Sequence, residues 1–403
     1  SRFWYIRGEF SEGRARSGAA LTRPGAEIRT SARAKALHGL GILAYSQCDY
    51  DEAERNHEES LSIRCEIGDR RGIADSLHNL GNVAHARGDH PMAEAHFERA
   101  LEMHTELDDS PGAAQAMSNL ASVKLAQGQN REARARLERS LEMWRRIGNP
   151  GGVAWDLNNL GILALERGDY LAAAAYLNEC LHLFEELGNR SGLAWTLQKL
   201  GSVEGDQERY APARILLEES LAIFDDLEDK HGRAWCLEGM GVVARGSGYL
   251  AAARSCTDRA TELFREIEDR QAVAYTTQRR GVLHRLEGDM DAAMACHSDA
   301  LSAFLSAGEP RGIMRALQEG AMIAVGEGRY ETSIGAWGAA DAMREAHDLF
   351  ISPAERNLFE PLLAAFRGAP PATLHMIELL LAVGHVAKAQ FDCRTHCAVP
   401  AMN

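Results

Sequence analysis

The chain has 403 residues, of which 45% are hydrophobic and 25% charged, and its formal net charge is −14. This composition is typical of a folded protein and excludes a disordered one, and the acidic excess argues against a nucleic-acid-binding surface, which needs clustered Lys and Arg. No apolar run is long enough to span a membrane, and the eight cysteines are scattered, as in proteins with reduced thiols. We therefore expect a cytoplasmic protein that contacts neither a membrane nor nucleic acid.

The sequence repeats with a period of 40 residues from about residue 31 to residue 330. One position of every period is a small residue: Gly41, Gly81, Ala121, Gly161, Gly201, Gly241, Gly281 and Ala321. Alanine recurs at a second position, from Ala53 to Ala293, and no insertion or deletion breaks the register. We count eight units, which begin near residues 31, 71, 111, 151, 191, 231, 271 and 311. So strict a period indicates a repeat architecture.

Within a unit the apolar residues have helical spacing. In the third unit, residues 114–125 and 133–144 each carry apolar side chains three or four positions apart, and a turn over 127–130 separates them. Between units, Gly68 can take a left-handed conformation at the end of one helix, and Asp69 can cap the next. Each unit is therefore predicted to be an antiparallel helix pair.

A single helix pair cannot bury its apolar face, so neighbouring pairs must stack into a solenoid. The rows of glycine and alanine allow the helices to approach closely, and larger side chains there would push them apart. The fold expected from these patterns is an all-α solenoid.

The segment from Leu77 to Asn82, followed by Ala84, Gly88-Asp89, Ala93, Phe97 and Ala100, matches a known repeat signature position by position. The chain thus resembles the tetratricopeptide repeat (TPR) family, although its units have 40 residues instead of the usual 34. The resemblance implies a right-handed α-solenoid of about eight helix pairs, whose first helices line a concave groove.

The domain organisation expected is one solenoid with incomplete ends. Residues 1–30 are read as a truncated N-terminal unit, so that more protein is expected to precede them, and residues 31–350 as the solenoid. Residues 351–390 are predicted to form capping helices, and residues 391–403 a disordered tail.

Three stretches carry a narrower resemblance: Phe3 to Gly8, Gly152 to Leu157, and Ala336 to Glu345. They are similar to the C-terminal TPR regions of bacterial signal-transduction ATPases and their linked transcription regulators. This likeness implies a sensor or partner-docking arm, attached in the full-length chain to an ATPase or output domain. The chain itself contains no phosphate-binding Gly-x-x-x-x-Gly-Lys-Ser/Thr loop.

No catalytic, cofactor or metal motif is recognisable, so we expect no enzyme activity, no cofactor and no metal. Cys393, His396 and Cys397 with His385 have the wrong spacing for common zinc sites. His38 and His78 occupy one repeat position a full unit apart, and solvated groove residues are the interpretation preferred for them.

Three rows of the first helices form candidate binding surfaces. The aromatic row is Trp155, Trp195, Trp235 and Tyr275; the polar row includes Asn158, Gln198, Glu238 and Gln278; the asparagine row is Asn79, Asn119 and Asn159. Aromatic faces beside amides suit an extended peptide, and the resemblance implies that such asparagines clamp its backbone. Lys199, Gly239 and Arg279 interrupt the asparagine row. The alternative is structural, with each ring packed across the adjacent unit's first helix.

The function expected is that of a non-catalytic protein-interaction and sensor arm of a bacterial regulator. A stand-alone adaptor that binds a peptide in its groove is one alternative, and a receptor in which a small molecule bridges units is another. The net charge of −14 favours a basic or neutral protein or peptide partner. The sequence leaves open the identity of the partner, the oligomeric state, the direction of regulation and the role of the Cys393–Cys397 tail.

Overall fold

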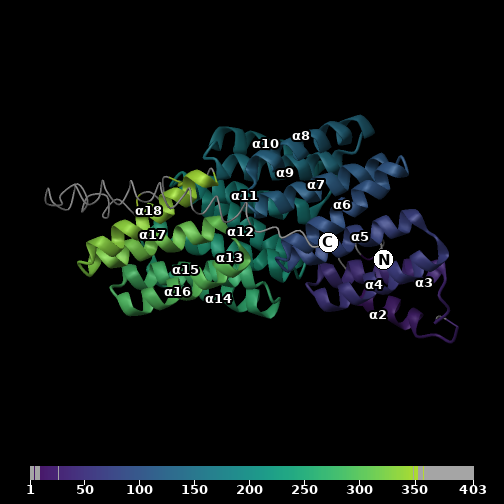
Figure 1. Ribbon diagram of the computed structural model, residues 1–403, viewed down its shortest axis with the longest axis horizontal. Helices are drawn as coiled ribbons and strands as arrows, with labels where there is room; N and C mark the ends of the chain where they lie inside the picture. The colour runs from purple at the N-terminus through teal and green to yellow at the C-terminus, as the bar shows by residue number, and fades with distance from the viewer. Residues whose placement is uncertain (1–3, 5–9, 26, 348, 353–356, 358–403) are drawn as a thin grey trace, which may run out of the picture.

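The helices stack in chain order as antiparallel pairs (Figure 1). The computed structural model describes residues 4, 10–25, 27–347, 349–352 and 357, and in this part it contains seventeen α-helices and no strand. Most of the segment expected to form capping helices, and all of the expected tail over 391–403, lie outside the described residues.

Eight units account for all but one of the described helices. The first helices are α3 (Ser31–Ser46), α5 (Arg70–Ala86), α7 (Ser110–Ala126), α9 (Pro150–Glu166), α11 (Arg190–Asp206), α13 (Lys230–Gly246), α15 (Arg270–Leu286) and α17 (Pro310–Gly326). The second helices are α4 (Tyr50–Ile67), α6 (His90–Glu106), α8 (Asn130–Ile147), α10 (Tyr170–Glu186), α12 (Tyr210–Asp226), α14 (Leu250–Glu266), α16 (Met290–Ala307) and α18 (Tyr330–Ala346). The remaining helix, α2 (Phe10–Leu21), packs against α3. The predicted number of units and their starting points are confirmed.

The turns have the predicted chemistry. After α4, Gly68 adopts φ 70°, and the Asp69 carboxylate accepts a hydrogen bond of 3.0 Å from the Gly72 N–H. A side-chain oxygen of an aspartate or asparagine caps most of the other helices in the same way, because one of these residues follows most of the left-handed residues. Five non-glycine residues also take the left-handed conformation: Cys48, Asp108, Glu208, Glu228 and Glu268.

Glycine sets the spacing of the helices. A Cβ atom on Gly161 would lie 2.7 Å from Cγ of Leu177, on the second helix of the same unit. A Cβ atom on Gly192 would lie 2.6 Å from the ring of Phe184, on the preceding helix. Close approach therefore occurs both within a unit and between units, and each glycine meets a large side chain that is fully buried.

The solenoid winds far enough for its successive turns to meet. A Cβ atom on Gly88 would lie 3.7 Å from the Gln271 side chain, and one on Gly128 would lie 3.7 Å from Pro310. Cys48 packs against the apolar cluster around Ala234 in the same way. The turns inside the early units thus contact the starts of first helices roughly four and a half units later. We call this contact between superhelical turns the seam.

Replacing Gly161 by Leu should overpack the centre of the fourth unit, because Leu177 already fills the available space. We expect a loss of roughly 1–3 kcal/mol in the free energy of unfolding, measured by chemical denaturation. Hydrogen exchange should quicken mainly over residues 151–230, since units couple to their neighbours, and also at the start of α17, where Arg311 contacts Glu166 of α9 across the seam.

The matched control is Gly320→Ala, also inside a first helix but with open space around the added methyl group. It should leave the protein as stable or raise its stability by up to about 1 kcal/mol, because alanine is the better helix former. Equal destabilisation by both changes would contradict the spacing role of Gly161.

A carboxyl group is fully buried in α9. The side chain of Asp156 is enclosed, and burial raises its pKa to about 6, although the Ser118 and Ser140 hydroxyls oppose the shift. The folded protein therefore holds this proton at pH values where the unfolded chain has released it. Its contribution to stability is largest at low pH and is lost as the pH rises from about 4 to about 6.

Asp156→Asn should consequently stabilise the protein by about 1–3 kcal/mol at pH 7, since one pKa unit corresponds to about 1.4 kcal/mol. The gain should vanish near pH 3, where the aspartate is protonated in both states. Denaturation curves of wild type and variant between pH 3 and pH 8 measure it, with the exposed Asp299→Asn as control. A gain that does not change with pH would contradict this account.

Candidate functional site

Four aromatic side chains lie in register on α9, α11, α13 and α15. Trp155 is 39% exposed, and the other three are half-buried. Each ring contacts a buried phenylalanine of its own unit's second helix, with centroid distances of 5.1 Å (Trp155–Phe184), 5.0 Å (Trp195–Phe224), 5.2 Å (Trp235–Phe264) and 4.9 Å (Tyr275–Phe304). In addition, Trp195 contacts His231 and Trp235 contacts Lys199, each on the first helix of an adjacent unit, as the structural alternative expected. The rings brace the helix pair and keep part of their surface exposed; we call them the aromatic ladder.

The ladder is joined into a network between the fifth and sixth units. The ring of His231 lies 5.4 Å from Trp195, and its Nε2 accepts a hydrogen bond of 3.0 Å from Nε1 of Trp235. The ammonium of Lys199 lies 5.8 Å above the Trp235 ring, within range of a cation–π interaction. These contacts hold the rings in fixed orientations.

Tyr275 ends the ladder with a polar anchor. Its hydroxyl hydrogen-bonds the carboxyl group of Glu309, the N-cap residue of α17. Burial raises the pKa of Tyr275 well above its ordinary value, and it also raises the pKa of Glu309. The fourth ring is therefore tied to the eighth unit.

Most of the polar row is buried, which corrects the expectation that it faces an open groove. Asn158 is 5% exposed, and Gln198 and Gln278 are each 2% exposed. At this repeat position the side chain points between helices, so the earlier expectation of a solvated His78 is also wrong: it is 7% exposed, and burial lowers its pKa to about 4. Glu238 is half-buried and forms an ion pair of 3.0 Å with Arg279.

The asparagine row is half-buried, and its amide groups already have partners within the solenoid. The side-chain amide of Asn79 donates to the Asp75 carbonyl at 2.8 Å. That of Asn119 donates to Oδ1 of Asn82 at 2.7 Å, and that of Asn159 donates to the Ser122 hydroxyl at 3.2 Å. These bonds bridge neighbouring first helices in two of the three cases, so a ligand would meet asparagines held in place.

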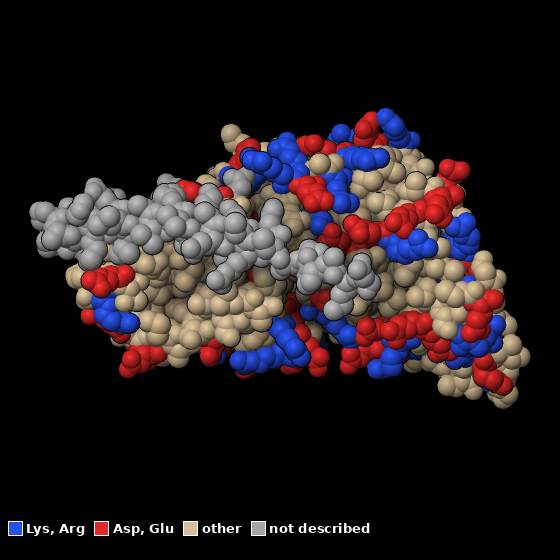
Figure 2. Space-filling view, in the orientation of Figure 1, with Lys and Arg blue, Asp and Glu red and all other residues tan. Residues whose placement is uncertain are grey.

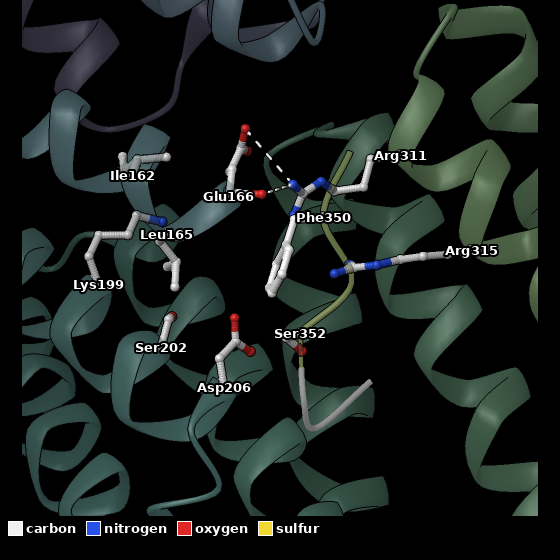
Figure 3. A pocket seen from close by; sticks show the side chains of 10 residues that line it. All are labelled: Ile162, Leu165, Glu166, Lys199, Ser202, Asp206, Arg311, Arg315, Phe350 and Ser352. Carbon is white, nitrogen blue, oxygen red and sulfur yellow. Dashed lines mark hydrogen bonds and ion pairs between the residues drawn. The ribbon is translucent and has the colours of Figure 1, made fainter. Parts of the chain in front are cut away.

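Sequence reasoning missed a cavity of about 160 Å³ between α9, α11 and α17, shown in Figure 3. Its wall contains five charged residues: Glu166, Lys199, Asp206, Arg311 and Arg315. The sequence did carry a signal, because a lysine replaces the asparagine at position 199 and an arginine follows the four aromatic residues at position 315. These charged side chains come together only because the superhelical turns meet at the seam. The repeat pattern of the sequence does not reveal that contact.

The cavity lies where two superhelical turns face each other. Arg311, at the start of α17, donates a hydrogen bond of 3.3 Å to the Glu166 carbonyl at the end of α9, and its guanidinium lies 4.0 Å from the Glu166 carboxylate. Lys199 approaches from α11 on the opposite wall (Figure 3). Burial lowers the pKa of its ammonium group, although Glu238 and Glu166 favour the charged form.

No cluster of three or more His, Cys, Asp or Glu side chains that could hold a metal occurs in the part of the chain that the structure describes. The set of His385, Cys393, His396 and Cys397 lies outside it. None of the described helices has the length and apolar character needed to cross a membrane. On the face seen in Figure 2, Lys and Arg side chains are interspersed with Asp and Glu.

Several solved structures share the fold. A Rap protein complexed with competence and sporulation factor has a TM-score of 0.63 and 12% identity, over 90% of this chain and 99% of that one. The Rap conjugation gene regulator of plasmid pLS20, in complex with the Phr* peptide, has a TM-score of 0.59 and 12% identity, over 85% and 96%. The apo form of RapI has a TM-score of 0.51 and 18% identity, over 67% and 97%. At these identities the likeness establishes the fold alone.

The family is established by sequence. No curated protein matches the chain over its length or in part. The tetratricopeptide repeat profile, in contrast, matches residues 32–106, 112–186, 157–226 and 192–266, which together span more than half of the chain. The 40-residue period, the helix pairs and this profile lead to one conclusion: the chain belongs to the tetratricopeptide repeat family.

Proposed function

We propose that this chain is a non-catalytic, peptide-binding sensor arm of a regulatory protein, and that the aromatic ladder is its main contact surface. The observation that carries the proposal is the ladder itself. Its rings are aligned at a spacing of one unit, braced from behind by phenylalanines and partly exposed in front. Rigid, half-exposed aromatic side chains are typical anchors of binding surfaces, because little conformational entropy is lost when a ligand packs on them.

The fold relatives support a peptide as the ligand class. One of them was solved with the Phr* peptide and another with competence and sporulation factor. An extended peptide presents apolar side chains and backbone amides in alternation, so rings and amide groups side by side suit it. The net charge of −14 favours a ligand that is neutral or basic overall.

The regulatory context is the finer part of the proposal. It depends on the likeness of Gly152–Leu157 and Ala336–Glu345 to the repeat arms of bacterial signal-transduction ATPases and linked transcription regulators. Sequencing the gene upstream of Ser1 tests it, because a nucleotide-binding loop there would support the regulator and a native start would favour the stand-alone adaptor. A receptor for a small molecule that bridges units is the third candidate, and the cavity between α11 and α17 is the observation that favours it.

Replacing Trp195 by Ala should weaken peptide binding about 30-fold, because an aromatic anchor contributes about 2 kcal/mol or more. Stability should fall less than the 3–5 kcal/mol typical of a fully buried ring, since Trp195 is only half-buried. The measurement is affinity selection from a randomised peptide pool on immobilised protein, with bound peptides quantified by mass spectrometry, alongside the melting temperature.

The matched control is Tyr249→Ala, which removes an aromatic side chain that is 69% exposed and lies outside the ladder. It should retain the peptides that the wild type selects. A sharp loss of melting temperature in Trp195→Ala with unchanged peptide selection would reject the binding role and leave the ladder a structural brace.

A further inference from the structure

We propose that a pocket between α4 and α6 binds an alkylammonium group, that is, a primary ammonium at the end of an unbranched apolar chain. The pocket has a volume of about 450 Å³ and lies over α5, against which both helices pack (Figure 1). Its lining comes from these three helices, whereas the aromatic ladder lies on α9, α11, α13 and α15. The site is therefore additional to the peptide-binding surface and independent of it.

The floor of the pocket is apolar. Leu80 and Ala84 of α5 form the bottom, and Leu61 of α4 and Met92 of α6 add to the sides. The floor residues are buried, whereas Met92 is 49% exposed. The volume lies within the range of roughly 300–1,000 Å³ that small-molecule pockets occupy. Such a surface suits a chain of methylene groups, because their burial is favourable.

The wall on α4 is negatively charged. Glu54 and Glu58 lie there one helical turn apart, and Glu54 shares the Arg87 guanidinium with Asp51. Among the described residues, neither the Glu58 carboxylate nor the Arg55 guanidinium of the same helix forms an ion pair within 4.0 Å. Three carboxylates of this stretch of α4 therefore share one guanidinium.

The other ionisable groups around the pocket leave this negative charge in place. At one end, Ser62 accepts a hydrogen bond of 2.6 Å from Arg29, whose guanidinium is paired with Glu66. On α6, burial lowers the pKa of His96 and so favours its neutral ring, although nearby carboxylates, Asp89 among them, oppose the shift. The pocket thus presents a surplus of negative charge beside an apolar floor.

The next unit shows how a lysine side chain fills the corresponding place. Lys124 occupies the repeat position of Ala84, and Glu94 occupies that of Glu54. The Lys124 side chain is 8% exposed, and its ammonium forms an ion pair with Glu94. An aliphatic stem can therefore lie between two second helices with its charged end on a wall carboxylate. At Ala84 the side chain ends at its methyl group, and the pocket lies beside it.

The repeat pattern limits this chemistry to one place. Carboxylates at both wall positions occur only in the first two units, as Glu54 with Glu58 and as Glu94 with Glu98. In the second of these pairs Lys124 supplies the ammonium from within the chain. We therefore expect a single alkylammonium site in the solenoid.

The first experiment observes the pocket directly in the full chain. NMR of methionine methyl groups follows Met92, whose resonance is assigned with Met92→Leu. The probes are n-pentylamine, which carries an ammonium at neutral pH, and n-pentanol, its neutral counterpart. At constant ionic strength the amine should shift the Met92 resonance saturably. The alcohol should bind at least tenfold more weakly, because it cannot form a charge-assisted hydrogen bond to a carboxylate.

Two substitutions test the residues that carry the charge and the space. Glu58→Gln should weaken n-pentylamine binding at least fivefold. The matched control is Glu218→Gln, at the same repeat position four units later and paired with Arg214, and it should leave the affinity unchanged. Ala84→Lys should abolish the shift, because the introduced ammonium would occupy the pocket as Lys124 does in the next unit. If Ala84→Lys does not fold, Glu58→Gln and its control decide.

A further comparison separates the two sources of an alkylammonium group, a free aliphatic diamine and a lysine side chain of a protein partner. The probes are cadaverine and Nα-acetyl-L-lysine amide. At least threefold tighter binding of cadaverine assigns the site to a free amine, since its two ends alone account for a factor of about two. Any smaller difference, or tighter binding of the lysine derivative, assigns the site to a lysine of a partner, because the pocket then tolerates a peptide backbone.

Three results would overturn the alkylammonium site. They are equal affinities for n-pentylamine and n-pentanol, undiminished n-pentylamine binding in Glu58→Gln, and an equal loss in Glu218→Gln. The first would leave an apolar pocket without charge selectivity, and the last would leave a general attraction of cations to an acidic protein.

Discussion

The close contact between glycine and a large buried side chain is the constraint on which the solenoid depends. Gly161 against Leu177 fixes the distance within a unit, and Gly192 against Phe184 fixes the distance between units. Because the same contacts recur every 40 residues, small offsets would accumulate along the stack. The placement of the aromatic ladder follows from this regularity, since side chains align only when successive helices are displaced by the same amount.

The repeat pattern was sufficient to predict the helix pairs, their caps and the number of units. These features are local or involve neighbouring units, and each leaves a periodic trace such as Gly68 before Asp69. The direction of a side chain within a helix was predicted less well. Asn158 and Trp155 are three residues apart on α9, yet one lies between helices and the other is partly exposed, because the solvent-facing stripe of a packed first helix is narrow.

The cavity could not be predicted for a different reason. Lys199 and Arg311 are separated by almost three units, and their approach depends on the total twist accumulated over those units. Twist is set by small differences in packing at each interface, and it is not encoded in any one motif. The sequence showed that Lys199 and Arg315 differ from the other residues at their repeat positions. This marks them as candidate site residues, but it does not show which residues they approach in the fold.

The seam makes this solenoid more cooperative than an open stack of repeats. An open stack of repeats behaves as a one-dimensional chain, in which each unit senses only the two beside it, and it can melt from either end. Contacts such as Gly88 with Gln271 and Arg311 with Glu166 add a second dimension, because units distant in sequence become neighbours. They raise the contact order, which slows folding, and they make unfolding of one end weaken the middle. Such long-range cooperativity would let a structural change in one turn of the superhelix alter the stability of the next turn.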